Sequence, residues 1–142
     1  MKMYKAQAPA KRNIIASLGH GADLLASIKE VAEEDHIKAA VFWVIGAVRK
    51  AAIGYYDQKE RRYVRISIDE PLEIASCTGN IARFKDETLV HAHITLADKD
   101  GKALGGHLYE GTGIYAAELY LTELDFKLER EYDETTGLNL FK

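Results

Sequence analysis

A nearly unbroken apolar segment at residues 39–48, AAVFWVIGAV, constrains the fold of this chain more than any other part of the sequence. It is rich in β-branched and aromatic side chains, which favour an extended backbone. A run without polar alternation is typical of a strand that is covered on both faces. We therefore predict a central strand here, with a bulge or bend at Gly46.

Short apolar segments separated by polar turns make up most of the remaining sequence. Residues 53–56 and 62–68 flank a polar turn at 57–60, and alternation in the second segment predicts a hairpin with one solvated face. Further strands are predicted at residues 14–18, 72–84, 89–97, 103–109 and 114–126.

The clearest helical pattern follows Gly19, His20 and Gly21. Residues 22–35 place apolar side chains on one face and polar ones on the other, and Asp23 suits the positive end of the helix dipole. One main amphipathic helix and about eight strands predict an α+β fold, with the helix packed on a mostly antiparallel or mixed sheet. A chain of 142 residues has the usual size of one domain, so residues 1–142 are predicted to form a single domain.

Charge and cysteine content narrow the functional classes. A formal net charge of −3 weighs against DNA binding by the monomer. The single cysteine, Cys77, cannot form an intramolecular disulfide, which favours a core thiol and a reducing compartment. The sequence has no apolar run long enough to span a membrane and no apolar stretch typical of a signal peptide at residues 1–11. We therefore expect a cytoplasmic protein without a membrane anchor.

A histidine cluster is the strongest indication of a functional site. Period-two alternation in the strand at 89–97 places His91 and His93 on one side and the apolar residues on the other. If residues 99–101 form a loop with Gly101 in the left-handed conformation, Asp98 pairs with Lys102. Counting along the paired strands from that turn, His93 then faces His107.

Three imidazoles in this arrangement could bind one transition-metal ion, because paired residues have Cβ atoms about 4.5–5.5 Å apart. Zinc, copper, iron and nickel all accept imidazole ligands, and zinc is predicted because it is common. A fourth position would stay open, at which zinc lowers the pKa of water to about 7. Gly105 and Gly106 could let a ligand or a neighbouring subunit approach. The alternative is a solvated sheet face with unrelated histidines.

Other candidate groups each have an ordinary structural explanation. The amides of residues 19–21 could bind an anion at the helix N-terminus, although a tight strand-to-helix turn explains them better. Glu73 could support a metal ligand or act as a general base, or it could be an exposed glutamate. A basic and aromatic patch could contact nucleic acid, or could be a solvated hairpin. That patch consists of Lys59, Arg61, Arg62 and Arg65 with Tyr55, Tyr56 and Tyr63.

Several short motifs together resemble the PPC domain, the plants-and-prokaryotes conserved domain. They are VIGA at 44–47, LEI at 72–74, TGNI at 78–81, HAHITL at 91–96, and GGHL at 105–108, and the likeness runs from about residue 13 to 132. The resemblance implies an α+β fold that assembles as a homotrimer. It also implies a metal held by the histidines that match His91, His93 and His107.

In plants this domain accompanies an AT-hook that grips A·T-rich DNA, so the resemblance also implies a DNA-binding or regulatory role. This sequence has no Arg-Gly-Arg-Pro hook, and residues 71–75 keep the plant Gly-Arg-Phe-Glu-Ile-Leu segment only in part. Two functions follow as hypotheses: a trimeric metal-binding protein associated with DNA or regulation, and a zinc-dependent enzyme acting on a small molecule through metal-bound water.

Overall fold

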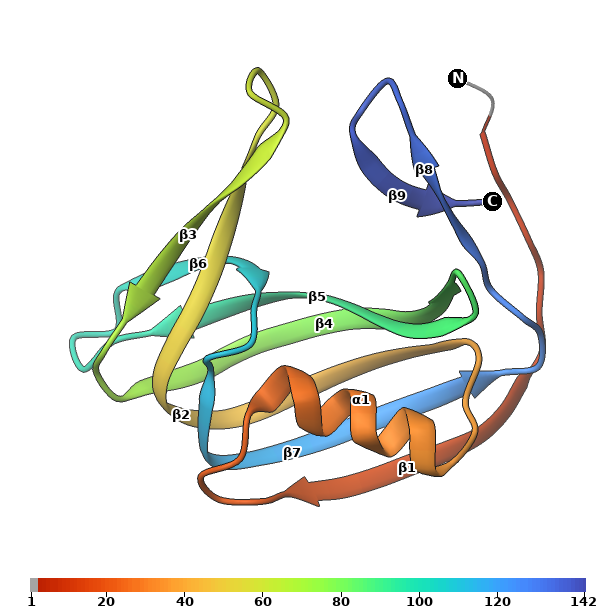
Figure 1. The fold of residues 1–142 in the computed structure, drawn as a ribbon. Coiled ribbons are helices and arrows are strands. Elements are labelled where there is room, and N and C mark those ends of the chain that lie inside the picture. Colours follow the sequence, from red (N-terminus) through yellow and green to blue (C-terminus); the bar gives the residue numbers. More distant parts are fainter. Residues whose placement is uncertain (1–2) are drawn as a thin grey trace.

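The computed structural model describes residues 3–142, and most of them lie in β-strands (Figure 1). Within these residues there is one helix, α1 (Leu24–Glu34). The strands are β1 (Ala10–Leu18), β2 (Ala40–Asp57), β3 (Arg62–Ile68), β4 (Leu72–Phe84), β5 (Glu87–Ala97), β6 (Ala103–Leu108), β7 (Gly113–Leu124), β8 (Arg130–Asp133) and β9 (Leu138–Phe141).

One antiparallel sheet of seven strands dominates the structure, with the order β1-β7-β2-β4-β5-β6 and with β3 paired to β2. The long strand β2 pairs first with β7 and β4, and then with β3 and β6. Because β6 also pairs with β5, the strands β2, β4, β5 and β6 close on themselves. The pair β8 and β9 forms a separate hairpin. The α+β class and the mostly antiparallel sheet agree with the prediction, although the helix is short.

Closure of the sheet depends on the close approach of β2 and β6. A Cβ atom at Gly106 would overlap with the carbonyl oxygen of Gly54, and one at Gly105 would overlap with that of Ile94. The two glycines therefore let strand backbones approach each other. Our interpretation that they leave space for a ligand or another subunit was wrong, because neighbouring strands fill that space.

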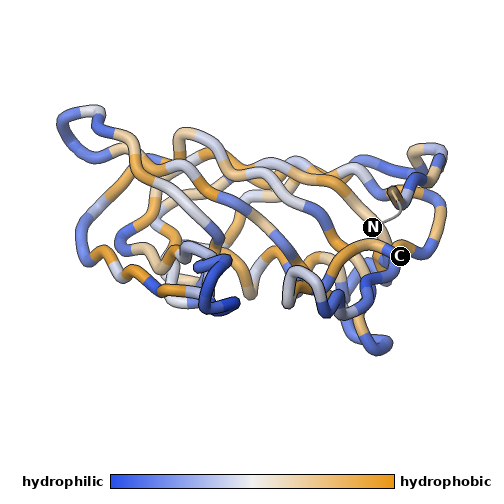
Figure 2. The backbone as a smooth tube through the Cα atoms, turned by 90° about the horizontal axis from the view of Figure 1, so that it is seen from above, coloured by the Kyte–Doolittle hydropathy of each residue, from blue (hydrophilic) through white to orange (hydrophobic). Residues whose placement is uncertain are grey.

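The hydrophobic core lies between α1 and the inner face of the sheet. Asp23 caps the helix, its Oδ1 accepting a hydrogen bond from the Ala26 amide, and Leu24, Ile28 and Ala32 are fully buried. Cys77 is part of the same core, as predicted for a structural thiol. Along the backbone, apolar residues follow the strands and hydrophilic residues gather at the hairpin tips (Figure 2).

Three features differ from the predicted pattern. The segments at 39–48 and 53–56 belong to one continuous strand, β2, and the predicted irregularity at Gly46 is confirmed as a register shift beside it. The predicted hairpin is confirmed as the antiparallel pair β2 and β3, but β3 is exposed on both faces over most of its length, whereas one covered face was expected. The β8–β9 hairpin was not predicted.

Among residues 3–142, no helix is long and apolar enough to cross a membrane.

Candidate metal centre

A tight turn between β5 and β6 fixes the register of the histidines. The Asp98 amide donates to the Lys102 carbonyl over 3.0 Å, and Gly101 has a φ of +76°. The Asp98 carboxylate also accepts from the amides of Asp100 and Lys102, both at 2.9 Å. His93 is consequently paired directly with His107, which confirms the pairing predicted from the sequence.

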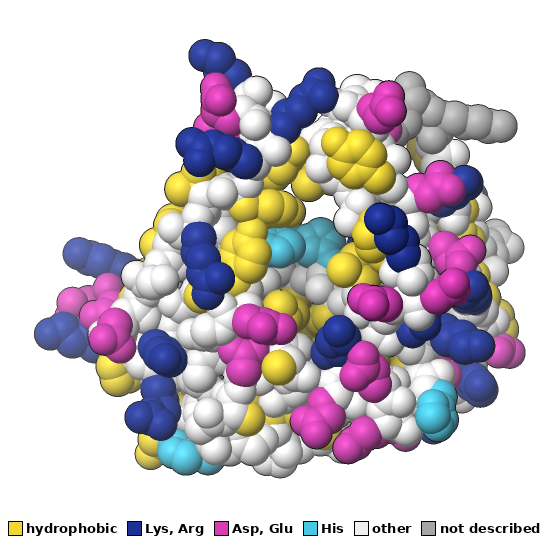
Figure 3. Space-filling view, viewed as in Figure 1, with side chains coloured by type: hydrophobic (Ala, Val, Ile, Leu, Met, Phe, Trp, Pro, Cys, Tyr) yellow, Lys and Arg dark blue, Asp and Glu magenta, His cyan; other side chains and the backbone are white. Residues whose placement is uncertain are grey.

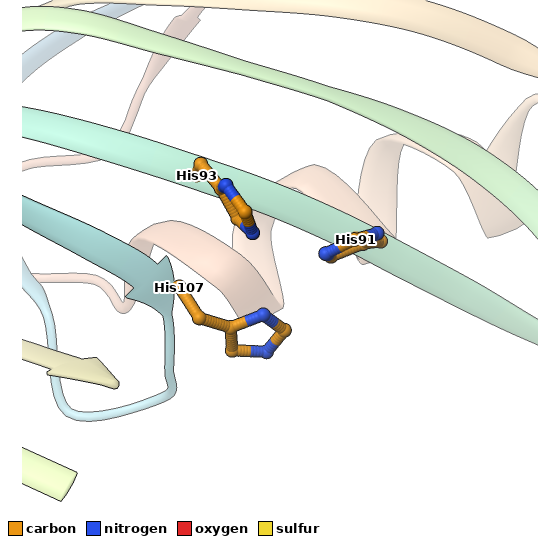
Figure 4. Close-up of side chains that lie close together, drawn as sticks. All are labelled: His91, His93 and His107. Carbon is orange, nitrogen blue, oxygen red and sulfur yellow. The ribbon is translucent and has the colours of Figure 1, made fainter. Parts of the chain in front are cut away.

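The three histidines converge from two adjacent strands (Figure 4). His91, His93 and His107 can each offer one ring nitrogen such that all three nitrogens lie within 4.8 Å of one another. Their ring centroids are 5.1 Å apart for His91 with His93 and for His91 with His107, and 5.8 Å apart for His93 with His107. The structure therefore brings the whole predicted set together.

Burial keeps two of these imidazoles neutral. It lowers the pKa of His91 from 6.5 to about 4, with smaller contributions from the charges of His107, Arg130 and His93. It also lowers the pKa of His107 to about 4, with a further contribution from His93. Neutral imidazole is the form that ligates metal ions, so these two side chains have free lone pairs at pH 7.

The three imidazoles are ligands that a transition metal accepts, and one of their nitrogens has no other bonding partner. Nδ1 of His107 is buried and has no hydrogen-bond partner, which is costly for a polar atom unless a further group meets it. Zinc bonds of about 2.0–2.1 Å in a tetrahedron place ligand nitrogens roughly 3.4 Å apart. The three ring nitrogens lie within 4.8 Å of one another, which exceeds that spacing by no more than about 1.4 Å.

Aromatic rings surround one side of the cluster. The rings of Tyr63 and Tyr109 lie 4.7 and 4.8 Å from the His107 ring, and Tyr56 lies 5.0 Å from Tyr63. Two tyrosines of the predicted nucleic-acid patch therefore belong to the surroundings of the histidines, because the β2–β3 hairpin folds against β6. Tyr109 was not singled out from the sequence, although period-two spacing after His107 was a usable signal.

Arg130, at the start of β8, lies beside the cluster on the other side. Its Nη2 donates to the Asn80 side chain over 2.8 Å, and Asn80 is paired directly with His91. Its guanidinium also covers the Phe141 ring at 4.1 Å. Burial lowers the pKa of this guanidinium. No local sequence pattern indicated Arg130 as a site residue, because the hairpin that carries it reaches the site only through the tertiary fold.

The histidines lie at the bottom of a hollow between the β2–β3 and β8–β9 hairpins, with hydrophobic side chains around them (Figure 3). A cavity of about 640 Å³ extends from His91 and His93 to Phe141 and to the N-terminal residues Tyr4, Lys5 and Ala6. A metal held by the three histidines would therefore be accessible to a small molecule.

The remaining sequence candidates lie elsewhere. Glu73 is exposed and pairs with Ala97, four residues along β5 from His93, or roughly 13 Å in an extended strand. His20 is exposed, and its Nδ1 is 2.7 Å from the Tyr115 carbonyl oxygen. Gly21 has a φ of +82°, as a tight turn before α1 requires. Burial raises the pKa of the Cys77 thiol to about 12, so it is no nucleophile.

Fold and site together define a class: small sheet-dominated α+β proteins that carry a cluster of three histidines in an open hollow. The family described as the Plants and Prokaryotes Conserved (PCC) domain matches residues 5–125. The chain belongs to this family, which is the one that the sequence motifs resemble under the name PPC.

Solved structures of similar chains support this assignment. A metal-containing protein from Archaeoglobus fulgidus is 39% identical, with 99% of both chains covered and a TM-score of 0.94. A plant- and prokaryote-conserved protein from Pyrococcus horikoshii is 30% identical, with 99% of this chain and 97% of that chain covered and a TM-score of 0.92. A proposed DNA-binding protein from Bacteroides thetaiotaomicron is 25% identical, with 95% and 96% covered and a TM-score of 0.88.

A curated relative is much longer than this chain. It is the bifunctional protein GlmU of Synechococcus sp. strain JA-3-3Ab, which is 32% identical over 120 residues. That match covers 82% of this chain and 18% of the relative, so the chain corresponds to a small part of that protein's length.

Proposed function

We propose that this chain is a trimeric, metal-binding PCC-domain protein in which His91, His93 and His107 hold a transition metal, with zinc as the first candidate. The observation that carries the proposal is the convergence of three ring nitrogens within 4.8 Å. Two further facts support it: the similar Archaeoglobus fulgidus protein is described as metal-containing, and Nδ1 of His107 is buried without a partner.

Metal content is the direct test of this proposal. The protein is purified without a histidine tag, incubated with zinc and desalted, and its zinc is measured by elemental analysis. We expect about one ion per chain, and a loss of most of it in His91→Ala and His107→Ala. His20→Ala is the matched control, since His20 is an exposed histidine outside the cluster. Equal zinc content in all four proteins would sink the proposed site.

An exposed apolar row on the outer face of the sheet supports assembly. Direct pairing across the sheet connects Ile15 to Tyr120, Tyr120 to Trp43, and Trp43 to Thr78. Ile15 is 77% exposed and Trp43 is 48% exposed, and their neighbours on β2, Val41 and Ile45, are each 45% exposed. Contiguous apolar surface of this kind marks contacts with other chains, and a second and third copy are the proposed occupants.

A DNA-associated regulatory role is the biological task that we propose for the trimer, in the cytoplasm. Its support is the family resemblance and the similar protein from Bacteroides thetaiotaomicron, which is described as a proposed DNA-binding protein. A gel shift on duplex DNA is the test, and we expect a complex that weakens as salt rises. No complex at low salt would exclude direct binding to that duplex and leave the metal site unaffected.

The second candidate is a zinc-dependent enzyme that acts on a small molecule, and the cavity beside His91 and His93 favours it. Zinc with three histidine ligands can activate water at neutral pH. The protein's own contribution would be the neutral ligands and the aromatic walls that limit access of bulk water. Turnover of an ester or amide panel that is lost in His107→Ala and on chelation would support this role.

A further inference from the structure

Arg130 brings a half-buried positive charge to the histidine cluster. Asn80 and His91 are direct partners across β4 and β5, so their side chains share one face of the sheet. The guanidinium donates to Asn80 Oδ1 over 2.8 Å and is therefore adjacent to His91. On its other side Nη1 donates to the Asn139 carbonyl over 2.7 Å.

No acidic side chain among residues 3–142 forms an ion pair with this guanidinium. In the described part of the chain, every ion pair involves other basic residues, and Arg130 has neutral partners only. Its Nε atom is buried without a hydrogen-bond partner. A partly buried guanidinium without a counter-charge is costly, and its planar fork of N–H donors matches a carboxylate.

The metal site adds positive charge in the same place. The cluster consists of histidines alone among the described residues, so a divalent ion there would keep its full charge. Together with Arg130 this makes a strongly positive site without a protein carboxylate. A ligand that completes it should therefore carry negative charge, with one oxygen on the ion and another on the guanidinium.

The apolar side chains around the site indicate the chemical character of the uncharged part of this ligand. Tyr63 and Tyr109 pack on His107, while Val41 and Phe141 line the cavity on the side of His91. Such walls stabilise a carbon skeleton and disfavour a small, strongly hydrated anion such as phosphate. We infer that the site takes a small organic carboxylate that bridges the metal ion and Arg130. This inference rests on the proposed metal function.

Cobalt(II) provides a test that does not depend on catalysis. The protein is loaded with Co²⁺, its metal content is measured, and its visible absorption spectrum is titrated with benzoate, acetate and phosphate. We expect benzoate to change the spectrum at lower concentration than phosphate does. Arg130→Gln should keep its Co²⁺ and bind benzoate at least about tenfold more weakly, because a charge-assisted hydrogen bond is lost.

Arg61→Gln is the matched control. Arg61 also ties the C-terminal segment to the β2–β3 hairpin, its Nη1 donating to the Glu134 carbonyl over 2.9 Å. Among residues 3–142 it is Arg130, and not Arg61, that donates to Asn80. Benzoate affinity should be unchanged in this variant. Equal weakening in both variants would reduce Arg130 to a structural role and overturn the inference.

The two proposals fail in different ways. Without Co²⁺ binding by the native protein, the metal site itself is wrong and the carboxylate inference falls with it. With Co²⁺ bound, a spectrum that benzoate leaves unchanged, or that phosphate changes at lower concentration, overturns the carboxylate ligand alone. The comparison of anions uses the native protein, so it holds even if Arg130→Gln disturbs the C-terminal hairpin.

Discussion

Trp43 of β2 and His93 of β5 are both paired directly with Thr78 of β4, one on each side of it. Since directly paired residues share a face of the sheet, the exposed apolar row and the histidine cluster form one continuous surface. Contacts with another copy and ligation of a metal would therefore occur on the same side of the molecule. Substitutions in the apolar row and substitutions of the histidines should distinguish assembly from metal binding.

Assembly should depend on the apolar row. Trp43 stacks on Tyr120 at 5.6 Å between ring centroids, and a charged residue at this position would place an unpaired charge in the proposed interface. Trp43→Asp should convert a species of three times the chain mass to monomer in sedimentation velocity. Tyr132→Asp, at an exposed aromatic residue on the separate β8–β9 hairpin, should stay trimeric. A monomeric native protein would refute the trimer.

The free energy of unfolding of the metal-free protein should decrease as the pH is lowered from 6.5 to about 4. The pKa values of His91 and His107 are lowered from 6.5 to about 4, so the unfolded chain takes up protons first as the pH falls. Stability present above pH 6.5 is therefore lost between 6.5 and about 4, on the order of 1–3 kcal/mol for the pair after discounting for partial exposure.

Urea denaturation at pH 7.0 and 4.5 measures this loss. Ionisable groups elsewhere add their own pH dependence, so the informative quantity is the difference between the native chain and the double variant His91→Gln, His107→Gln. The double variant should lose less free energy of unfolding over the same interval. An identical loss in both proteins would contradict the burial of neutral histidines.

Closure of the sheet should be sensitive to one methyl group. In Gly106→Ala the new Cβ would overlap with the Gly54 backbone, which cannot move independently of β2. We expect a loss of about 2 kcal/mol or more in the free energy of unfolding. Gly19→Ala is the control, because its Cβ would meet only the Ala22 side chain at 4.0 Å. A Gly106→Ala protein as stable as the control would show that β6 can move away from β2.

Asp23 should contribute more to the free energy of unfolding than an ordinary helix N-cap does. Its Oδ1 accepts from the Ala26 amide over 2.9 Å, and its Oδ2 accepts from the amides of Gly111 and Thr112 over 2.7 and 3.1 Å. Asp23→Ala should cost about 2 kcal/mol, the upper end of the range for cap removal. The stability of Asp23→Asn should lie between those of the native protein and Asp23→Ala, because one of the two side-chain acceptors becomes a donor. Thermal denaturation of the three proteins would show whether this order holds.

The sequence by itself determined the local patterns and one long-range relationship. Alternation placed His91 and His93 on one side of a strand, and the turn that Gly101 permits fixed the register that sets His93 opposite His107. These features are predictable because period-two alternation and turn geometry act over a few neighbouring residues.

Only the tertiary structure decided what surrounds the histidines. The β2–β3 hairpin brings Tyr63 to His107, and the C-terminal hairpin brings Arg130 to Asn80 beside His91. From the sequence, Gly105 and Gly106 suggested space for a ligand. In the structure they lie where neighbouring strand backbones come into close contact. These relationships depend on how β2 bends and closes against β6, and on the packing of segments far apart along the chain. Local propensity carries no information about such contacts.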